Sequence, residues 1–189
     1  MTVNTILLVI AGLVPAVVLC FYVFSKDKVE KEPLPLLLKL LLLGAISCLP
    51  AAYLETAIIS VIDGIFKNLT MTPILDRIYK AVYYFIGVAL VEEGLKWLIL
   101  YYVTKNNKEF NCIFDGMIYA IFVSLGFAAF ENVLYVMEYG WINAVMRAIL
   151  SVPGHMFFAV MMGWYYSLWH ITELAVYNKS AANCSYIFQ

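Results

Sequence analysis

The sequence predicts an all-α fold: a polytopic transmembrane helical bundle with about five spans plus a short interfacial or re-entrant half-helix. Hydrophobic residues make up 64% of the 189 residues and charged residues 13%, whereas a soluble domain is nearer half apolar and one quarter charged. The mean hydropathy is +0.87. We therefore expect a single membrane-embedded domain over residues 1–189, with its motif-bearing core at residues 81–177.

The first two spans follow from apolar runs of the length that crosses a bilayer as a helix. The first run covers residues 5–24, and a polar stretch, residues 25–33, separates it from a second run at residues 34–62. The first run has no basic segment before it and no small-residue cleavage site after it, so we expect an uncleaved span.

Two further spans follow a loop rich in charges and helix breakers at residues 63–80. The third span is predicted at residues 81–103, and residues 104–111 form another polar connection. The fourth runs from Asp115 to about residue 138. Aspartate is a favoured N-cap residue, so Asp115 is expected to cap this helix.

The remaining apolar stretch, residues 141–177, is too long for one span and contains Pro153 and Gly154. Proline removes a backbone donor and crowds the preceding turn. We therefore expect a half-helix at residues 141–152, about 18 Å long and too short to cross, and a span at residues 155–177. The half-helix carries a polar stripe of Asn143, Arg147 and Ser151.

Positively charged residues in short loops favour the cytoplasmic side and so orient the bundle. One side carries Lys26, Lys28, Lys31, Lys105, Lys108 and Lys179; the other carries Lys67, Arg77 and Lys80, plus Arg147 if the half-helix lies there. This bias predicts a multi-pass protein of the cell (plasma) membrane with an outside N-terminus. The four cysteines, Cys20, Cys48, Cys112 and Cys184, have no paired spacing, so no disulfide framework is expected.

Two adjacent acids, Glu92 and Glu93, lie in the middle of the third span. A charged group near the bilayer midplane costs about 2.5–3.5 kcal/mol on insertion scales, so such residues are functional candidates by default. Lys96 follows Glu92 by one helical turn, in the favourable order for an ion pair. An internal ion pair that stabilises a helix interface is the alternative interpretation, but it leaves Glu93 without a local partner.

The next helices add further polar candidates within apolar runs. The fourth span supplies Glu131 and Asn132, with Tyr135 one turn later, and His155 opens the last span. Two helices that each offer an acid and a third that offers a histidine predict a water-activating site. With the N-terminus outside, these residues lie at or outside the midplane. Glu55 is a weaker candidate for the lining.

Four blocks of the sequence, between residues 91 and 163, together resemble the PrsW family of intramembrane proteases. This family is related to the CAAX prenyl endopeptidases and the bacteriocin-processing enzymes. The blocks are Glu92-Glu93-Gly-Leu-Lys96, Asp115-Gly116-Met-Ile-Tyr119, Gly126-Phe127-Ala-Ala-Phe130-Glu131-Asn132-Val-Leu-Tyr135, and Arg147 with Pro153-Gly154-His155.

The resemblance implies an intramembrane endopeptidase that makes the first, extracytoplasmic cut in a single-span anti-sigma factor during a stress response. Its catalytic residues would be Glu92, Glu93, Glu131 and His155, supported by Lys96, Asn132, Tyr135 and Arg147. The expected partners are this substrate and the lipid bilayer, with no nucleic acid. Family members commonly carry a later His-Gly-x-x-Asp-like block that helps bind the oxyanion, and none occurs before Gln189.

We expect no cofactor and a metal-independent reaction, in which Glu92 or Glu93 deprotonates a water held jointly with His155. Lys96 would hold one acid ionised while burial favours the neutral form of the other. A zinc enzyme is one alternative, and would need His155 plus two of the glutamates. A proton- or ion-coupled transporter and a non-catalytic binding or immunity protein are the others.

Overall fold

All regular secondary structure in the described part of the chain is helical. The computed structural model describes residues 3–26 and 31–177, and contains no strand in these ranges. Its elements are α1 (Val3–Lys26), α2 (Leu34–Phe66), α3 (Pro73–Val82), η1 (Tyr83–Ala89), α4 (Leu90–Thr104), α5 (Ile113–Tyr139), α6 (Trp141–Met146), η2 (Arg147–Ser151) and α7 (Val152–Tyr177). The predicted all-α class is confirmed. Lys28, Lys179 and Cys184 lie outside the described residues.

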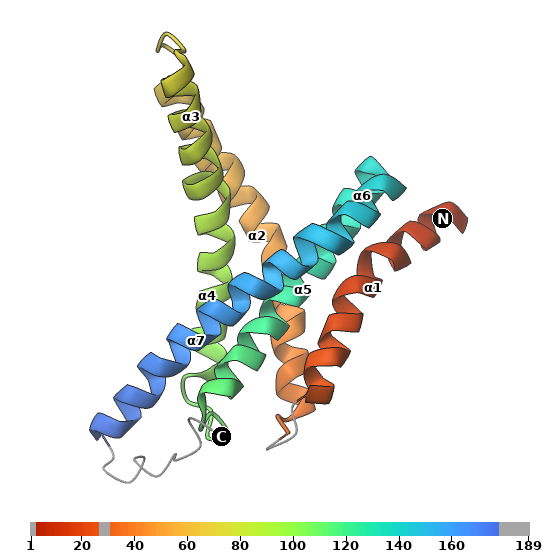
Figure 1. Cartoon of the computed structure of the whole chain (residues 1–189), viewed down its shortest axis with the longest axis vertical. Coiled ribbons are helices and arrows are strands. Elements are labelled where there is room, and N and C mark those ends of the chain that lie inside the picture. Colours follow the sequence, from red (N-terminus) through yellow and green to blue (C-terminus); the bar gives the residue numbers. More distant parts are fainter. Residues whose placement is uncertain (1–2, 27–30, 178–189) are drawn as a thin grey trace.

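Four helical stretches are long and apolar enough to span a membrane: Val3–Lys26, Leu34–Phe66, Ile113–Tyr139 and Trp141–Glu173. The predicted span at residues 81–103 falls on the end of α3, on η1 and on α4. These three follow one another as one rod (Figure 1), with helical torsions at both junctions. This rod differs from the four stretches above because the π-helical η1 divides it and because it carries charged residues inside. The chain therefore forms a multi-pass membrane bundle.

Helix α5 forms the centre of the bundle. It packs against α1, α2, α4 and α7, which lie around it in Figure 1. Nearly every residue from Asp115 to Ala128 is buried. A helix that is apolar on all sides is suited to the centre of a bundle, and this burial gives α5 a fixed position from which the site can be built.

The crossing of α2 and α5 depends on two glycines, one on each helix, that face the backbone of the opposite helix. A Cβ atom at Gly44 would overlap the carbonyl oxygen of Val123, and one at Gly126 would overlap the carbonyl oxygen of Leu41. Small residues at such crossings let membrane helices approach closely. The two glycines therefore set the distance between α2 and α5.

Gly126→Ala is expected to lower the free energy of unfolding by about 1–3 kcal/mol, because the added methyl group forces the two helices apart. Thermal unfolding in detergent measures the effect. Gly64→Ala is the matched control, since a Cβ at Gly64 meets nothing within 4 Å. Equal midpoints for the two variants would contradict the close crossing.

The expected break at Pro153 and Gly154 is wrong. Helical backbone continues from Trp141 through η2 into α7, as the blue helix of Figure 1 shows. In η2 the N–H of Val152 donates to the oxygen of Arg147, five residues earlier. This wider π turn directly precedes Pro153, where it relieves the crowding that proline imposes on an ordinary α-helix.

The start of α5 also differs from the prediction. The N-cap residue is Cys112, and Asp115 stands three positions later. An Asp115 carboxylate oxygen accepts hydrogen bonds from the backbone N–H groups of Asn111 and Cys112, at 3.0 and 2.9 Å. This is the reciprocal arrangement of a capping box. Burial and the hydrogen bond to Asp115 raise the pKa of the Cys112 thiol to about 12, so the thiol stays protonated and acts as a donor.

Candidate active site

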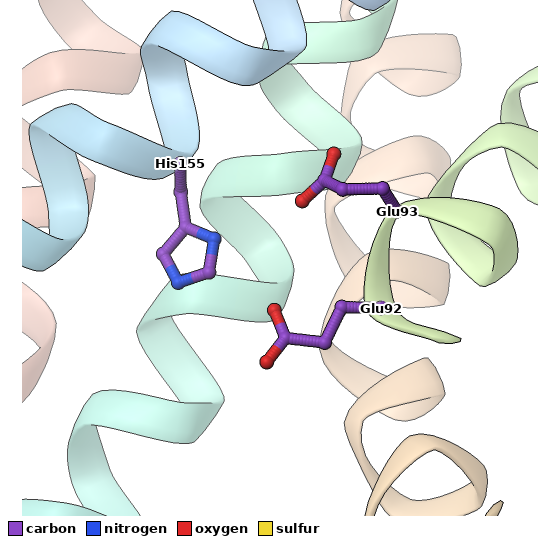
Figure 2. A group of neighbouring side chains, drawn as sticks. All are labelled: Glu92, Glu93 and His155. Carbon is purple, nitrogen blue, oxygen red and sulfur yellow. The ribbon is translucent and has the colours of Figure 1, made fainter. Parts of the chain in front are cut away.

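Glu92, Glu93 and His155 converge from two helices. The two acids lie in the first turn of α4 and the histidine lies in the first turn of α7. Figure 2 shows both carboxylates pointing toward the imidazole ring. One ligand atom from each of the three residues lies within 4.8 Å of the others. The fold thus brings together residues that are more than 60 positions apart in the sequence.

The Lys96 ammonium occupies the centre of this group. Its Nζ lies 2.7 Å from Glu93 Oε1, 3.1 Å from Glu92 Oε2 and 3.1 Å from His155 Nδ1. The side chain is 1% exposed, and Nζ lies 4.0 Å from the centre of the Phe127 ring. An ammonium has three N–H donors, so the three partners use all of them. The expectation that Glu93 lacks a local partner is wrong, because Lys96 reaches both acids.

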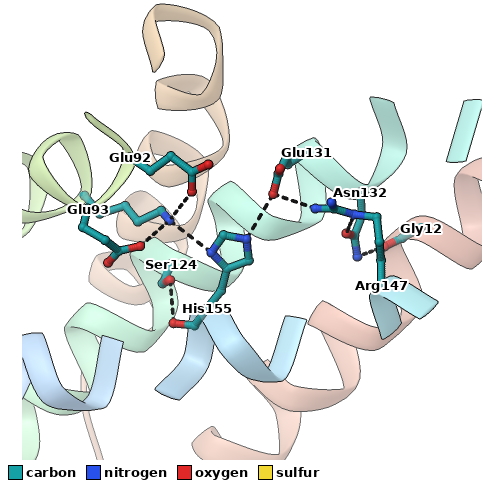
Figure 3. Close-up of polar contacts among 9 residues, drawn as sticks. Gly12, Glu92, Glu93, Ser124, Glu131, Asn132, Arg147 and His155 are labelled. Atoms are coloured by element: carbon teal, nitrogen blue, oxygen red, sulfur yellow. Dashed lines mark hydrogen bonds and ion pairs between the residues drawn. The ribbon is translucent and has the colours of Figure 1, made fainter. Parts of the chain in front are cut away.

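These contacts define how the His155 ring is oriented. An ammonium can only donate, so Nδ1 accepts from Lys96 and the ring proton sits on Nε2. Nε2 then donates to Glu131 Oε2 at 3.0 Å, and Ser124 Oγ donates to the His155 carbonyl at 3.0 Å. The basic nitrogen of His155 is therefore directed toward Glu92 and Glu93 (Figure 3).

Glu131 lies on the other side of His155 from the acid pair. Arg147 Nη2 lies 2.6 Å from Glu131 Oε2, an ion pair whose N–H direction does not meet hydrogen-bond geometry. Arg147 Nε donates to Asn132 Oδ1 at 2.6 Å, and the guanidinium lies 4.1 Å from the Tyr135 ring. The structure places Glu131 between Arg147 and His155, where it orients the imidazole.

Asn132 connects this network to α1. Its Nδ2 donates to the carbonyl oxygen of Gly12 at 3.4 Å, as Figure 3 shows. The predicted supporting residues Asn132, Tyr135 and Arg147 therefore all lie around Glu131 rather than around the acid pair. Sequence reasoning missed Ser124. Its position two turns before Glu131, on the same face of one helix, was the available signal.

A cavity of about 350 Å³ opens beside the acid pair, between the η1–α4 rod and the η2–α7 helix. Its lining is Val88, Ala89, Glu92, Glu93, Leu150, Ser151, Gly154, His155 and Phe158. Glu131 and Glu55 are not part of this lining. The acid pair and His155 are therefore the charged and titratable groups that a molecule in the cavity would meet.

The three converging groups fit a divalent metal ion. Two carboxylates and one imidazole are a donor set that zinc accepts. Glu93 Oε2 is buried without a hydrogen-bond partner among the described residues, which leaves one oxygen free to coordinate. The Lys96 ammonium already holds a positive charge between the same three side chains, and it would leave this position when a metal ion binds.

Fold and site together define a multi-pass membrane protein with a carboxylate, ammonium and imidazole centre enclosed between its helices. The chain belongs to the PrsW family, because the model described as PrsW family intramembrane metalloprotease matches residues 32–187. The expectation of a metal-independent reaction differs from this description. The zinc alternative requires His155 and two of the glutamates without specifying which two, and the structure brings Glu92 and Glu93 together with His155.

Curated relatives agree with the family. The chain is 34% identical over 159 residues to a protein named Protease PrsW from Geobacillus kaustophilus, a match that covers 84% of the chain and 65% of the relative. It is 35% identical over 155 residues to the protein of that name from Oceanobacillus iheyensis, covering 82% and 66%. The Bacillus subtilis relative is 31% identical over 155 residues, covering 82% and 65%. The matches thus span about two thirds of the relatives' length. No solved structure matches the chain significantly.

Proposed function

We propose that this chain is an intramembrane endopeptidase whose reaction centre is formed by Glu92, Glu93 and His155. The observation that carries the proposal is the convergence of these three side chains within 4.8 Å on one cavity. Charged groups are expensive inside a membrane and mark functional sites there. Membership of the PrsW family supports hydrolysis of a peptide bond as the reaction.

The chemistry requires a water in the cavity, beside the acid pair. A carboxylate of Glu92 or Glu93 accepts a proton from this water while the water oxygen attacks the carbonyl carbon of the substrate peptide. The same carboxylate then returns the proton to the leaving amine nitrogen as the C–N bond breaks. The imidazole of His155 lines the same cavity with Nδ1 directed toward the acid pair, and Glu131 holds the ring in that orientation. A divalent metal ion, when bound by Glu92, Glu93 and His155, supplies Lewis acidity there.

The substrate is proposed to be a single-span membrane protein, specifically an anti-sigma factor, cut on its extracytoplasmic side in the plasma membrane. This substrate is what the resemblance of the four sequence blocks to the PrsW family implies, and the relatives' name supports a protease. An outside N-terminus is proposed from the distribution of lysine and arginine in the loops. In that orientation the reaction centre lies at or outside the midplane, where an extracytoplasmic cut requires it.

Co-expression with a tagged single-span anti-sigma factor tests this function. We expect a shortened tagged fragment with the wild-type chain and none with His155→Ala, because the basic nitrogen beside the acid pair is lost. Immunoblots of membranes measure the fragment and the level of the protein. The same fragment in cells that lack the chain would contradict the proposal.

Metal removal tests the coordination by Glu92, Glu93 and His155. Purified protein treated with a strong chelator is expected to lose cleavage and to recover it when zinc is added back. Zinc is also expected to raise the midpoint of thermal unfolding of the wild type and not of His155→Ala. Full cleavage by protein shown to contain no metal would overturn the metal assignment and leave the glutamate chemistry in place.

A further inference from the structure

The hairpin of α2 and α3 is longer than the hydrocarbon core of a membrane is thick. Helix α2 has 33 residues and is about 50 Å long at 1.5 Å per residue, whereas a bilayer with both headgroup layers is about 40–45 Å thick. Membrane helices tilt by up to about 40°, so a tilted α2 runs from one headgroup layer to the other. The end of the hairpin, residues 63–80, stands apart from α1 and α6 in Figure 1, and we call it the hairpin tip.

The hairpin tip exposes apolar side chains. No residue of α3 is buried. Ile74 is 72% exposed and Ile78 49%, and Leu69 and Met71 in the preceding turn are exposed as well. Ile74 and Ile78 share one face of α3, because they are four residues apart. An amphipathic helix with such a face lies in the membrane interface and buries that face by about 5–10 Å at the boundary between headgroups and acyl chains.

Two cations of the hairpin tip have no partner in the protein. Lys80 forms an ion pair with Asp76 at 2.8 Å. The side chains of Lys67 and Arg77 are exposed and make no ion pair or hydrogen bond to another residue of the described ranges. Arg77 follows Ile74 by three positions, so the two side chains are neighbours on the surface of α3. Free positive charge and exposed apolar surface therefore lie side by side.

Both acids of the hairpin tip have partners. Asp76 is paired with Lys80, and Asp63 accepts a hydrogen bond from the Tyr79 hydroxyl across the hairpin at 2.7 Å. Tyrosine is also a residue type that concentrates where a membrane meets water, which agrees with a position of the tip at the headgroups. The tip thus carries two unpartnered cations and, among its described residues, no unpartnered acid.

We propose that the hairpin tip is a binding surface for anionic phospholipid headgroups. Lys67 and Arg77 bind the phosphodiester groups, and the four exposed apolar side chains enter the boundary with the acyl chains. Charge complementarity selects anionic lipid, because a zwitterionic headgroup brings a cation of its own next to Lys67 and Arg77. The partner is therefore an anionic phospholipid of the leaflet that the tip enters, and this contact does not depend on the reaction at Glu92 and Glu93.

The contact reaches the reaction centre through the continuous rod of α3, η1 and α4. Arg77 stands 15 residues before Glu92 on this rod, roughly 20 Å along its axis. A headgroup bound by Arg77 fixes one end of the rod that carries both acids. A ligand that binds only the folded protein stabilises it, so anionic lipid is expected to raise the midpoint of thermal unfolding.

Lipid titration of the purified full chain in detergent, followed by native mass spectrometry, tests the proposal. The probes are phosphatidylglycerol and phosphatidylcholine with the same acyl chains, and the measured quantity is the ratio of their dissociation constants. A basic residue near an anionic surface strengthens binding about fivefold, so two of them predict a preference of about 25-fold for phosphatidylglycerol. The double variant Lys67→Gln with Arg77→Gln should lose this preference and the rise in unfolding midpoint.

Two further double variants serve as controls. Lys105→Gln with Lys108→Gln removes the same charge beyond the other end of α4, and Lys67→Arg with Arg77→Lys keeps the charge of the tip; both should keep the wild-type preference. Thermal unfolding without added lipid shows that each variant is folded. A wild type without preference, an unchanged preference after the glutamine substitutions at the tip, or an equal loss in the Lys105 and Lys108 variant would each overturn the proposal.

Discussion

Glu92→Gln and Glu93→Gln are each expected to reduce the rate of substrate cleavage by at least about a hundredfold. Glutamine keeps the shape of the side chain and removes the proton acceptor, and general acid–base catalysis contributes typically 10²–10⁴-fold. The measurement is the initial rate of fragment formation by purified protein in detergent or liposomes. Each acid also binds the Lys96 ammonium with a separate contact, so the loss of either disturbs the centre and we expect neither to replace the other.

Glu138→Gln provides the control for this experiment. It makes the same change in charge at an exposed position on α5, away from the cavity lining, and should retain the wild-type rate. Thermal unfolding shows whether the two site variants remain folded. Wild-type rates in both Glu92→Gln and Glu93→Gln would refute the assigned chemistry, whatever the role of a metal ion.

Lys96→Met is expected to lower the free energy of unfolding by about 3 kcal/mol when metal is absent. The variant keeps the apolar stem and removes the ammonium that holds Glu92, Glu93 and His155 together. Breaking a buried charge pair by removing one partner leaves the other charge uncompensated, at about 3–5 kcal/mol. We use the lower figure because the Glu93 side chain is 26% exposed. Thermal unfolding in the presence of a chelator measures the loss.

Lys80→Met is the matched control, because Lys80 and Asp76 form the same i, i+4 type of pair at an exposed position, with side chains 61% and 47% exposed. Exposed pairs contribute about 0–1 kcal/mol. Zinc should also stabilise Lys96→Met more than the wild type, since the ion no longer displaces an ammonium. Similar midpoints for the two lysine variants would show that Lys96 does not carry this role.

The fold class and most helix positions could be predicted from the sequence, because apolar runs of bilayer length allow few other structures. The ends of the helices and the interruptions within them were harder to predict. Pro153 predicts a helix end when only its missing N–H is considered, but the π turn at residues 147–151 accommodates it. Asp115 predicts an N-cap, yet the helix begins three residues earlier because Cys112 takes that position. Such choices depend on one hydrogen bond, which composition does not specify.

For the site, the sequence predicted which charged residues lie in apolar surroundings. It did not predict which of them line the cavity and which lie on the other side of His155. Glu131 was placed with the acids, and its position beside Arg147 depends on how α5 and η2 pack. Lys96 was expected to pair with one acid, whereas its flexible stem lets Nζ reach residues at both i−3 and i−4. The cavity could not be predicted at all, because its walls come from segments that are distant in the chain.

The two π-helical segments have a consequence for how the catalytic helices tolerate changes in length. Each contains a wider turn than an α-helix, and each stands directly before catalytic residues. Deleting one residue from an ordinary α-helical turn would rotate everything after it by about 100°. Deleting one residue from residues 83–89, for example Phe85, would instead convert the wider turn into an α-helical one and leave Glu92 and Glu93 on nearly the same face. These two turns are thus the places where the catalytic helices can absorb a change of one residue in length.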